Sequence, residues 1–275
     1  MVIVCVRPLY VLGFQPVQED NLRLVGLPDQ AIPIVRSFAD ALEEALPGKV
    51  EGIYLIGSLA LRDFRPGQSD IDFLAILDPT ADVNALSRVR RIVSAAHPNV
   101  DCDGIYLSTG ELALPPAGTG PSAREGKVVL ASGDERHAVT WLTLLRHGIT
   151  VKGRLPSSEW IAADETQAAF HSRQNLISYW LPWLNQRRSL TEFDNWSVAW
   201  GCLGVARLHA AIVRNEMLSK SAAGHHALEY FPRHLPIIEE ALNLREGGSS
   251  GYSSTTMRAS DLTEFMDELI SSLSR

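Results

Sequence analysis

The stretch from Ile53 to Leu77, IYLIGSLALRDFRPGQSDIDFLAIL, constrains the fold more than any other part of this sequence. Two short apolar runs, Ile53–Ile56 and Ile71–Leu77, are typical of buried strands. An Arg-Pro-Gly turn between them predicts that the chain folds back and that the two strands are neighbours. A Gly-Ser pair follows the first run and an Asp-Ile-Asp sequence opens the second, so polar groups gather at the ends of two adjacent buried strands.

The two aspartates, Asp70 and Asp72, are one residue apart at the start of the second strand. Residues i and i+2 of a strand point to the same face, so their carboxylates become neighbours while Ile71 and Phe73 point into the core. Two carboxylates this close disfavour joint ionisation unless a cation lies between them. Mg²⁺ binds a few carboxylate oxygens and completes its coordination with water and substrate phosphates. We therefore expect Asp70 and Asp72 to bind the magnesium of a metal–nucleotide complex.

The Gly57-Ser58 pair predicts a phosphate site beside this metal site. Glycine permits close approach of the backbone, and the serine hydroxyl and the N–H groups of a following helix start can hold a phosphate. Each motif alone has a simpler interpretation as a solvated turn. Their order between two apolar strands favours a site in which the phosphates and the metal face one crevice.

The first half of the chain alternates helical and strand patterns, which predicts an α+β domain with a mixed sheet over residues 1–157. Apolar residues recur at helical spacing over 33–46, and a Pro-Gly pair ends that run. A second helix is predicted over 83–96 and a third strand over Val100–Leu107. The Pro/Gly/Ser-rich stretch Pro115–Gly126 is interpreted as an excursion within this domain.

Strand patterns end near residue 160, and a second, all-helical domain is predicted over residues 158–275. Its last helix shows the i, i+3, i+4, i+7 spacing of apolar residues after a serine that is predicted to be its N-cap, Ser260. The expected helices cover residues 167–185, 194–214, 219–230, 236–244 and 261–273.

The net charge of the chain indicates which kind of binding partner is favoured. The net charge of −7 without a Lys/Arg cluster repels nucleic-acid backbones and attracts cations, which favours a small cationic partner over DNA or RNA. No run of 18 apolar residues is present, so we expect no membrane segment. We also expect a monomer.

The cysteines and the N-terminal segment indicate the cellular compartment to expect. The three cysteines, Cys5, Cys102 and Cys202, are far apart and lack metal-ligand spacing, which indicates buried thiols and a reducing cytoplasm. The apolar opening MVIVCVRPLYVLGF is interrupted by Arg7-Pro8 and is interpreted as a strand or tail rather than a secretory signal.

The segment GSLALRDFRPGQSDID resembles the G-S then D-x-D signature of the polymerase-β-like nucleotidyltransferase superfamily, which transfers a nucleoside monophosphate from an NTP to a hydroxyl. The later segment WGCLGVARLHAAIVRNEMLSKSAAGHHALEYFP resembles the helical domain of the streptomycin/spectinomycin adenylyltransferases. Together these resemblances cover most of residues 50–245. They imply Mg²⁺-dependent transfer of AMP from ATP.

The resemblance also implies roles for single residues. A third carboxylate on the next strand would be a metal ligand and the catalytic base, and VDCDGIYL offers Asp101 and Asp103 on one face. The D-G-x-Y-L run favours Asp103, while Asp101 stays open as the alternative. Lys220, in LSKSAAG, would reach the nucleotide phosphates from the helical domain, although a lysine after a serine N-cap is otherwise a solvated helix start. Gly57, Ser58 and Ser69 would complete the nucleotide site.

The acceptor is implied to be a small cationic molecule, with an aminoglycoside or aminocyclitol antibiotic as the specific hypothesis. The residues 115–140 contain no counterpart of the tryptophan with which the streptomycin enzymes hold the drug. Glu192 and Asp194 could attract an amino sugar, but acidic residues at helix N-termini have a dipole reason of their own. Two alternatives stay open: transfer to a protein or nucleotide hydroxyl, and a non-catalytic, antitoxin-like binding module.

Overall fold

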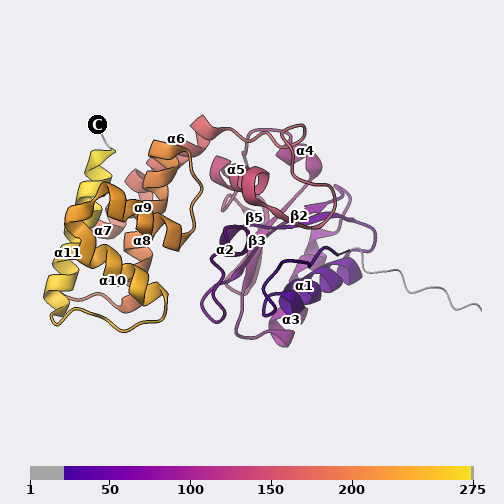
Figure 1. The fold of residues 1–275 in the computed structure, drawn as a ribbon. Coiled ribbons are helices and arrows are strands. Elements are labelled where there is room, and N and C mark those ends of the chain that lie inside the picture. Colours follow the sequence, from indigo (N-terminus) through magenta and orange to yellow (C-terminus); the bar gives the residue numbers. More distant parts are fainter. Residues whose placement is uncertain (1–21, 274–275) are drawn as a thin grey trace, which may run out of the picture.

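A computed structural model of the protein describes residues 22–273. The opening segment MVIVCVRPLYVLGF lies outside the described residues, so the strand or tail predicted there is not tested. Figure 1 shows two parts side by side. We call them the sheet region, which runs to the last strand residue Lys152, and the helical region, from Glu165 to Leu273. The predicted α+β class with a following helical part is confirmed.

The described residues form one mixed sheet with the strand order β5-β4-β3-β2-β1-β6. Strands β2 and β3 are parallel, and the other neighbours are antiparallel. The prediction that the first two apolar runs are adjacent strands is confirmed, because β1 pairs with β2. The strands are β1 (Val50–Leu55), β2 (Ile71–Leu77), β3 (Cys102–Leu107), β4 (Gly120–Arg124), β5 (Lys127–Ser132) and β6 (Ile149–Lys152).

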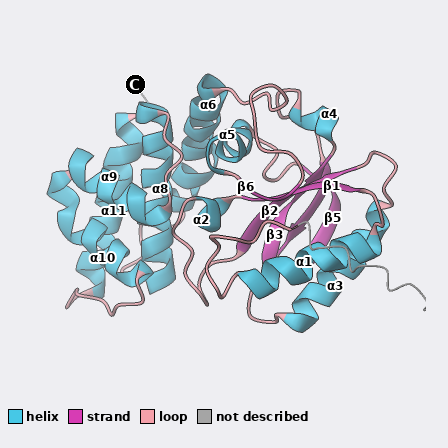
Figure 2. Ribbon diagram, turned by 45° about the vertical axis from the view of Figure 1, so that its right-hand side comes forward, coloured by secondary structure: helices cyan, strands magenta, loops and turns pink. Residues whose placement is uncertain are grey.

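Helices cover both faces of the sheet (Figure 2). Helices α1 (Ile32–Ala45) and α3 (Leu86–Ala96) pack on one face, where Phe38 meets Phe73 with ring centroids 4.3 Å apart. The short helix α4 (Thr109–Leu112) and helix α5 (Ala138–His147) pack on the other face. Ile71 and Phe73 are fully buried, as predicted. Strand alternation therefore places Asp70 and Asp72 on the α5 face, at the end of the sheet.

The helical region packs around α8, which contacts α6, α9, α10 and α11. Its elements are α6 (Glu165–Asn175), a π-helical turn (Leu176–Trp180), α7 (Leu181–Asn185), α8 (Asn195–Arg214), α9 (Lys220–Tyr230), α10 (Leu235–Arg245) and α11 (Thr255–Ser272). The helical region also contains the 3₁₀ turn Pro232–His234, and the sheet region contains the short pieces α2 (Gly57–Ala60) and the 3₁₀ turn Val83–Ala85. Among the described helices, α8 alone is long and apolar enough to cross a membrane, but half of its apolar window is buried inside the protein, as in a core helix.

The two regions share an apolar contact. Ala138 and Leu142 of α5 pack with Ala168 of α6, Ala211 of α8 and Met217 in one buried cluster. This contact lies at the chain crossing from the sheet region to the helical region, and it fixes α6 and α8 against α5. The domain boundary expected at residues 157–158 stays a prediction.

Two local expectations need correction. The stretch Pro115–Gly126, interpreted as an excursion, contributes a strand, and the hairpin of β4 and β5 turns at Glu125-Gly126 with φ of +47° and +77°. The β4 sequence, GPSAR, lacks the β-branched residues that are typical of strands, so hydrogen bonding to β3 decides its conformation. Helix α11 begins at Thr255 after an N-cap at Ser254, not at Ser260, because the Ser254 hydroxyl accepts the Met257 N–H at 3.2 Å.

A buried histidine pair joins α8 to α9. His209 Nδ1 lies 2.8 Å from His226 Nε2, and the ring of Tyr230 packs against both. In a hydrogen bond between the two rings one nitrogen donates and the other accepts, so the accepting ring is neutral. Burial, with the neighbouring His226, lowers the pKa of His209 to about 4.

This pair makes stability depend on pH. An unfolded histidine has a pKa of about 6.5, so the unfolded state binds more protons between pH 6.5 and 4. The stabilisation is complete above pH 6.5 and is lost as pH falls toward 4, by up to about 3 kcal/mol. In denaturant unfolding, the free energy of unfolding of His209→Phe should depend less steeply on pH in this window than that of the parent protein. The exposed His225→Phe variant should keep the parent slope, and equal slopes in all three proteins would contradict the prediction.

Candidate active site

The three predicted carboxylates come together at one end of β2 and β3. Asp70 immediately precedes β2, and Asp72 pairs in parallel register with Asp103 of β3. All three line a single groove. Parallel pairing places Asp72 and Asp103 side by side. The sequence alone could not establish this register, because a helix separates the two strands.

Gly57 lets the Gly-Ser turn approach this group closely. Its φ is +58°, and a Cβ built on it would lie 1.8 Å from Asp72 Oδ2. The backbone N–H of Ser58 donates a hydrogen bond to Asp72. This corrects one expectation, since the Ser58 N–H holds a carboxylate rather than standing free for a phosphate. The Ser58 hydroxyl oxygen is buried and has no hydrogen-bond partner among the described residues, so it can still receive a phosphate oxygen.

One side of the aspartate pair is a cationic pocket of about 140 Å³. Lys220 is the first residue of α9, after the Ser219 N-cap, and it reaches this pocket from the helical region. Burial lowers the pKa of Lys220, and the charges of Arg207 and Arg245 lower it further. These three cations face three aspartates of the same pocket, and one of the aspartates, Asp63, is paired with Arg245. With a metal ion on Asp70 and Asp72, the remaining positive charge would favour an anionic ligand. The residues that define the cationic pocket are Gly57, Ser58, Leu61, Asp63, Gln68, Ser69, Asp70, Asp72, Arg207, Ser219, Lys220 and Arg245.

The other side of the pair is an acidic groove of about 180 Å³. Asp103, Asp134 and Glu135 contribute its negative charge, and Arg124 is its single cationic residue among those described. Asp70 and Asp72 belong to both spaces, so they form the wall between the cationic pocket and the acidic groove. The residues that define the acidic groove are Asp70, Asp72, Asp103, Ser122, Arg124, Asp134 and Glu135.

Glu135 is held ionised in the acidic groove. The N–H of Thr140 donates to His137 Nδ1 at 3.3 Å, which leaves Nε2 to carry the proton and face Glu135 Oε2 at 3.4 Å. This hydrogen bond is the largest effect on the pKa of Glu135 and lowers it well below its usual value. The side chain keeps 56% of its area exposed, so a ligand can reach it.

The structure separates the surroundings of Asp101 and Asp103. Arg90 pairs with Asp101 through Nη2 and donates from Nη1 to the Cys102 carbonyl at 2.7 Å. Asp101 does not line the acidic groove, whereas Asp103 does. Asp103 Oδ1 is buried without a hydrogen-bond partner, with Arg90 Nη2 at 3.5 Å from it. The geometry therefore favours Asp103 as the third carboxylate of the site.

The carboxylates fit a metal that is shared with a substrate. Burial, together with the charges of Glu135 and Asp70, raises the pKa of Asp72 to about 6, so a cation would stabilise its charged form. Within residues 22–273 no group of three or more His, Cys, Asp or Glu side chains is arranged to hold a metal ion by itself. Mg²⁺ usually takes one or two carboxylates together with substrate phosphates, and Asp70 and Asp72 beside a phosphate-sized cationic pocket offer that donor set.

The comparison with known families agrees with this arrangement. Residues 35–101 match the family model described as a nucleotidyltransferase domain, and this segment contains Gly57, Ser58, Asp70 and Asp72. Residues 35–101 are thus similar to nucleotidyltransferase domains, and we use that name for them below. The resemblance drawn from the GSLALRDFRPGQSDID segment is thereby confirmed.

The fold around the nucleotidyltransferase domain is also that of a known enzyme structure. The crystal structure of spectinomycin adenyltransferase AAD(9) from Enterococcus faecialis, with ATP and spectinomycin, superposes with a TM-score of 0.66. The match covers 89% of this chain and 99% of that chain at 12% sequence identity, so it establishes a shared fold across both regions. No curated protein matches the chain by sequence.

An aromatic cavity continues from the cationic pocket of the nucleotidyltransferase domain into the helical region. It has a volume of about 410 Å³ and shares Gln68, Lys220 and Arg245 with that pocket. Trp196 and Trp200 line it with stacked rings, 5.0 Å between centroids and 15° between planes. Planar aromatic faces next to a cationic pocket suit a heterocyclic base attached to phosphates.

Several residues of the site escaped the sequence analysis, and three of them carry charges that matter most to the proposal. Arg207 and Arg245 lie at the cationic pocket, and Glu135 lies at the acidic groove. Arg207 and Arg245 occupy helical positions where arginine is ordinarily a surface residue, so no local pattern marks them. The sequence offers one indication of Glu135, because two acidic residues stand together in SGDERH just before a helix. Acidic residues at this place usually indicate only the start of a helix.

The acceptor residues considered from sequence lie elsewhere. Asp194 is the N-cap of α8, and its carboxylate accepts the Ser197 N–H at 2.6 Å, so the dipole interpretation is the one that the structure supports. Glu192 is exposed and lines none of the three spaces around the nucleotidyltransferase domain.

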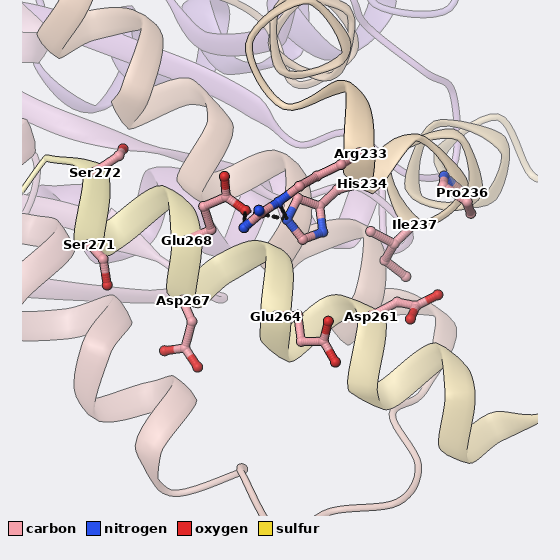
Figure 3. A pocket seen from close by; sticks show the side chains of 10 residues that line it. All are labelled: Arg233, His234, Pro236, Ile237, Asp261, Glu264, Asp267, Glu268, Ser271 and Ser272. Atoms are coloured by element: carbon pink, nitrogen blue, oxygen red, sulfur yellow. Dashed lines mark hydrogen bonds and ion pairs between the residues drawn. The ribbon is translucent and has the colours of Figure 1, made fainter.

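A larger cavity, of about 1030 Å³, lies on the helical region between the Arg233-His234 turn and α11. In Figure 3, Arg233 and His234 are joined to Glu268 of α11. His234 Nε2 lies 2.7 Å from Glu268 Oε2. Arg233, His234 and Glu268 thus form ion pairs with one another. No residue of the aspartate pair or the Gly-Ser turn lines this cavity, so we assign it no part in the proposed chemistry.

Proposed function

We propose that the protein is a Mg²⁺-dependent nucleotidyltransferase that transfers AMP from ATP to a hydroxyl of a small cationic acceptor, an aminoglycoside or aminocyclitol. One observation carries the proposal: Asp70 and Asp72 form the wall between a cationic pocket and an acidic groove. A polyanionic donor and a cationic acceptor would then meet at the same two carboxylates.

The donor would lie on the cationic side. Lys220 and Arg207 would bind triphosphate oxygens, the free Ser58 hydroxyl would donate to one of them, and the base would stack in the Trp196/Trp200 cavity. Asp70 and Asp72 would hold Mg²⁺, which when bound neutralises phosphate charge and lowers the pKa of the attacking hydroxyl.

The acceptor would enter from the acidic groove. Glu135 would bind one of its ammonium groups, and Asp103 would accept the proton of its hydroxyl. The hydroxyl oxygen forms a bond to the α-phosphorus while the bond from that phosphorus to the oxygen bridging it to the β-phosphorus breaks, so pyrophosphate leaves toward the cationic pocket. The proton on Asp103 then passes to solvent, because the Asp103 side chain keeps 20% of its area exposed.

The experiment is incubation of the protein with ATP labelled at the α-phosphorus, Mg²⁺, and a panel of aminoglycosides and aminocyclitols. We expect label on at least one cationic acceptor, and loss of labelling with EDTA. Label on a protein instead would favour the alternative acceptor class. Binding of ATP without any turnover would contradict an enzymatic function.

Replacing Glu135 by glutamine tests the acceptor side. We expect the KM for the acceptor to rise about 10-fold or more, because a hydrogen bond to a charged partner contributes roughly 1.5–3 kcal/mol. The KM for ATP should stay the same. Steady-state kinetics with each substrate varied in turn measure both values. Glu159→Gln removes the same charge from an exposed position outside the site and is the matched control. An unchanged acceptor KM in Glu135→Gln would place the acceptor elsewhere.

A further inference from the structure

Asp63 connects the two sides of the cationic pocket. It lies in the loop after α2, where its own N–H donates to the Ser58 carbonyl at 2.8 Å. The backbone of Asp63 is thus tied to the Gly-Ser turn that packs against Asp72. Its side chain keeps only 7% of its area exposed and turns toward the helical region.

The carboxylate of Asp63 binds the helical region at two places. At the start of α9 it accepts the Ser221 hydroxyl at 2.9 Å and the Ser221 N–H at 3.2 Å. At the end of α10 it accepts from Arg245 Nε at 3.1 Å and Nη2 at 3.0 Å. The Asp63 carbonyl takes a further bond from Arg245 Nη2 at 3.1 Å. Every acceptor group of this residue is engaged across the interface.

These contacts bear directly on the phosphate-binding side chains. Ser221 is the neighbour of Lys220 in the first turn of α9, and Arg245 itself lines the cationic pocket. Arg65 adds to the same junction, since its Nη2 donates to the Ser221 hydroxyl at 3.2 Å. Without Asp63, Arg245 would face Lys220 and Arg207 with no carboxylate bound to it.

We propose that Asp63 is a positioning residue that holds Lys220 and Arg245 of the helical region at the distance from Ser58, Asp70 and Asp72 that nucleotide binding requires. The proposal rests on the proposed function in that the bound ligand is a nucleoside triphosphate. It assigns to Asp63 no contact with the reacting atoms. Asp63 acts through side chains that bind phosphates, so its loss should weaken ATP binding more than it slows the chemical step.

The test is the variant Asp63→Asn, which keeps the size of the side chain but cannot accept all of these hydrogen bonds or balance Arg245. We expect the Kd for ATP–Mg²⁺, measured by calorimetry, and the KM for ATP to rise about 10-fold. The kcat should fall less than about 3-fold, and the acceptor KM should stay unchanged. Asp78→Asn is the matched control, since Asp78 is a partly exposed aspartate of the sheet region that bonds locally to Thr80.

A second variant separates positioning from folding. Ser221→Ala removes one donor to Asp63 and should raise the Kd for ATP by about 3-fold. The double variant should bind ATP no more weakly than Asp63→Asn alone, because both changes break the same contact. An unchanged Kd in Ser221→Ala, or additive effects in the double variant, would overturn the proposal.

The calorimetric readout keeps the two proposals distinguishable. ATP binding needs no turnover, so a parent protein that binds ATP but labels no acceptor would contradict the proposed function and leave the Asp63 test decisive. A parent protein that labels an acceptor while Asp63→Asn has an unchanged Kd and KM for ATP would contradict the positioning role alone.

Discussion

The variant Gly57→Ala is expected to lose nucleotidyl transfer by about 100-fold or more, since displacing a catalytic group by about 1 Å can cost that much. The new methyl carbon would stand 1.8 Å from Asp72 Oδ2 and 2.4 Å from Asp72 Cγ, so the carboxylate must leave its position. The φ of +58° adds backbone strain of roughly 1–2 kcal/mol. In steady-state kinetics we expect the kcat/KM for ATP to fall by this factor. The Mg²⁺ concentration that gives the half-maximal rate should rise.

A second glycine separates strain from displacement. Gly48, in the turn between α1 and β1, has a φ of +66° and nothing within 4 Å of its added Cβ. Gly48→Ala should therefore suffer the same backbone strain as Gly57→Ala, seen as a lower urea midpoint of unfolding, but it should keep full activity. If Gly57→Ala were as active as Gly48→Ala, then Asp72 would not be needed in its present position.

Much of the architecture could be predicted because local patterns and tertiary packing agree. The strand predicted over Ile71–Leu77 matches β2 at both ends, since it is buried on both faces and reads as one apolar run. The β4–β5 hairpin could not be predicted, because Gly120–Arg124 has no strand pattern of its own and depends on pairing with β3. The start of α11 was placed too late, because the residues from Thr255 to Ser260 have no apolar periodicity.

The site could be predicted only in part, for a related reason. Asp70 and Asp72 follow from alternation within one strand, which is a local property. Their division of the site into a cationic and an acidic side depends on Arg207 of α8, Arg245 of α10 and Glu135 in the loop before α5. Sequence spacing carries no information on such convergence, so the proposal that the acceptor enters from the acidic groove needed the structure.

Asp103 is the residue whose loss should separate chemistry from binding. If it accepts the proton of the attacking hydroxyl, Asp103→Asn should lower kcat by about 10² to 10⁴-fold, the usual contribution of a general base. The Kd for ATP–Mg²⁺ should change far less than in Asp72→Asn, because Asp103 lines the acidic groove and not the cationic pocket. Single-turnover labelling and calorimetry on the same preparations would measure the two quantities.

The neighbouring aspartate provides the control that decides between the two candidates for this role. Asp101 shares its strand face with Asp103, but it forms the closer ion pair with Arg90, lies outside the acidic groove and keeps 47% of its side-chain area exposed. Asp101→Asn removes the same charge from a position outside the groove and should lower kcat less than about 10-fold. A larger loss in Asp101→Asn than in Asp103→Asn would reverse the assignment, because the base must be the carboxylate on which the rate of the chemical step depends.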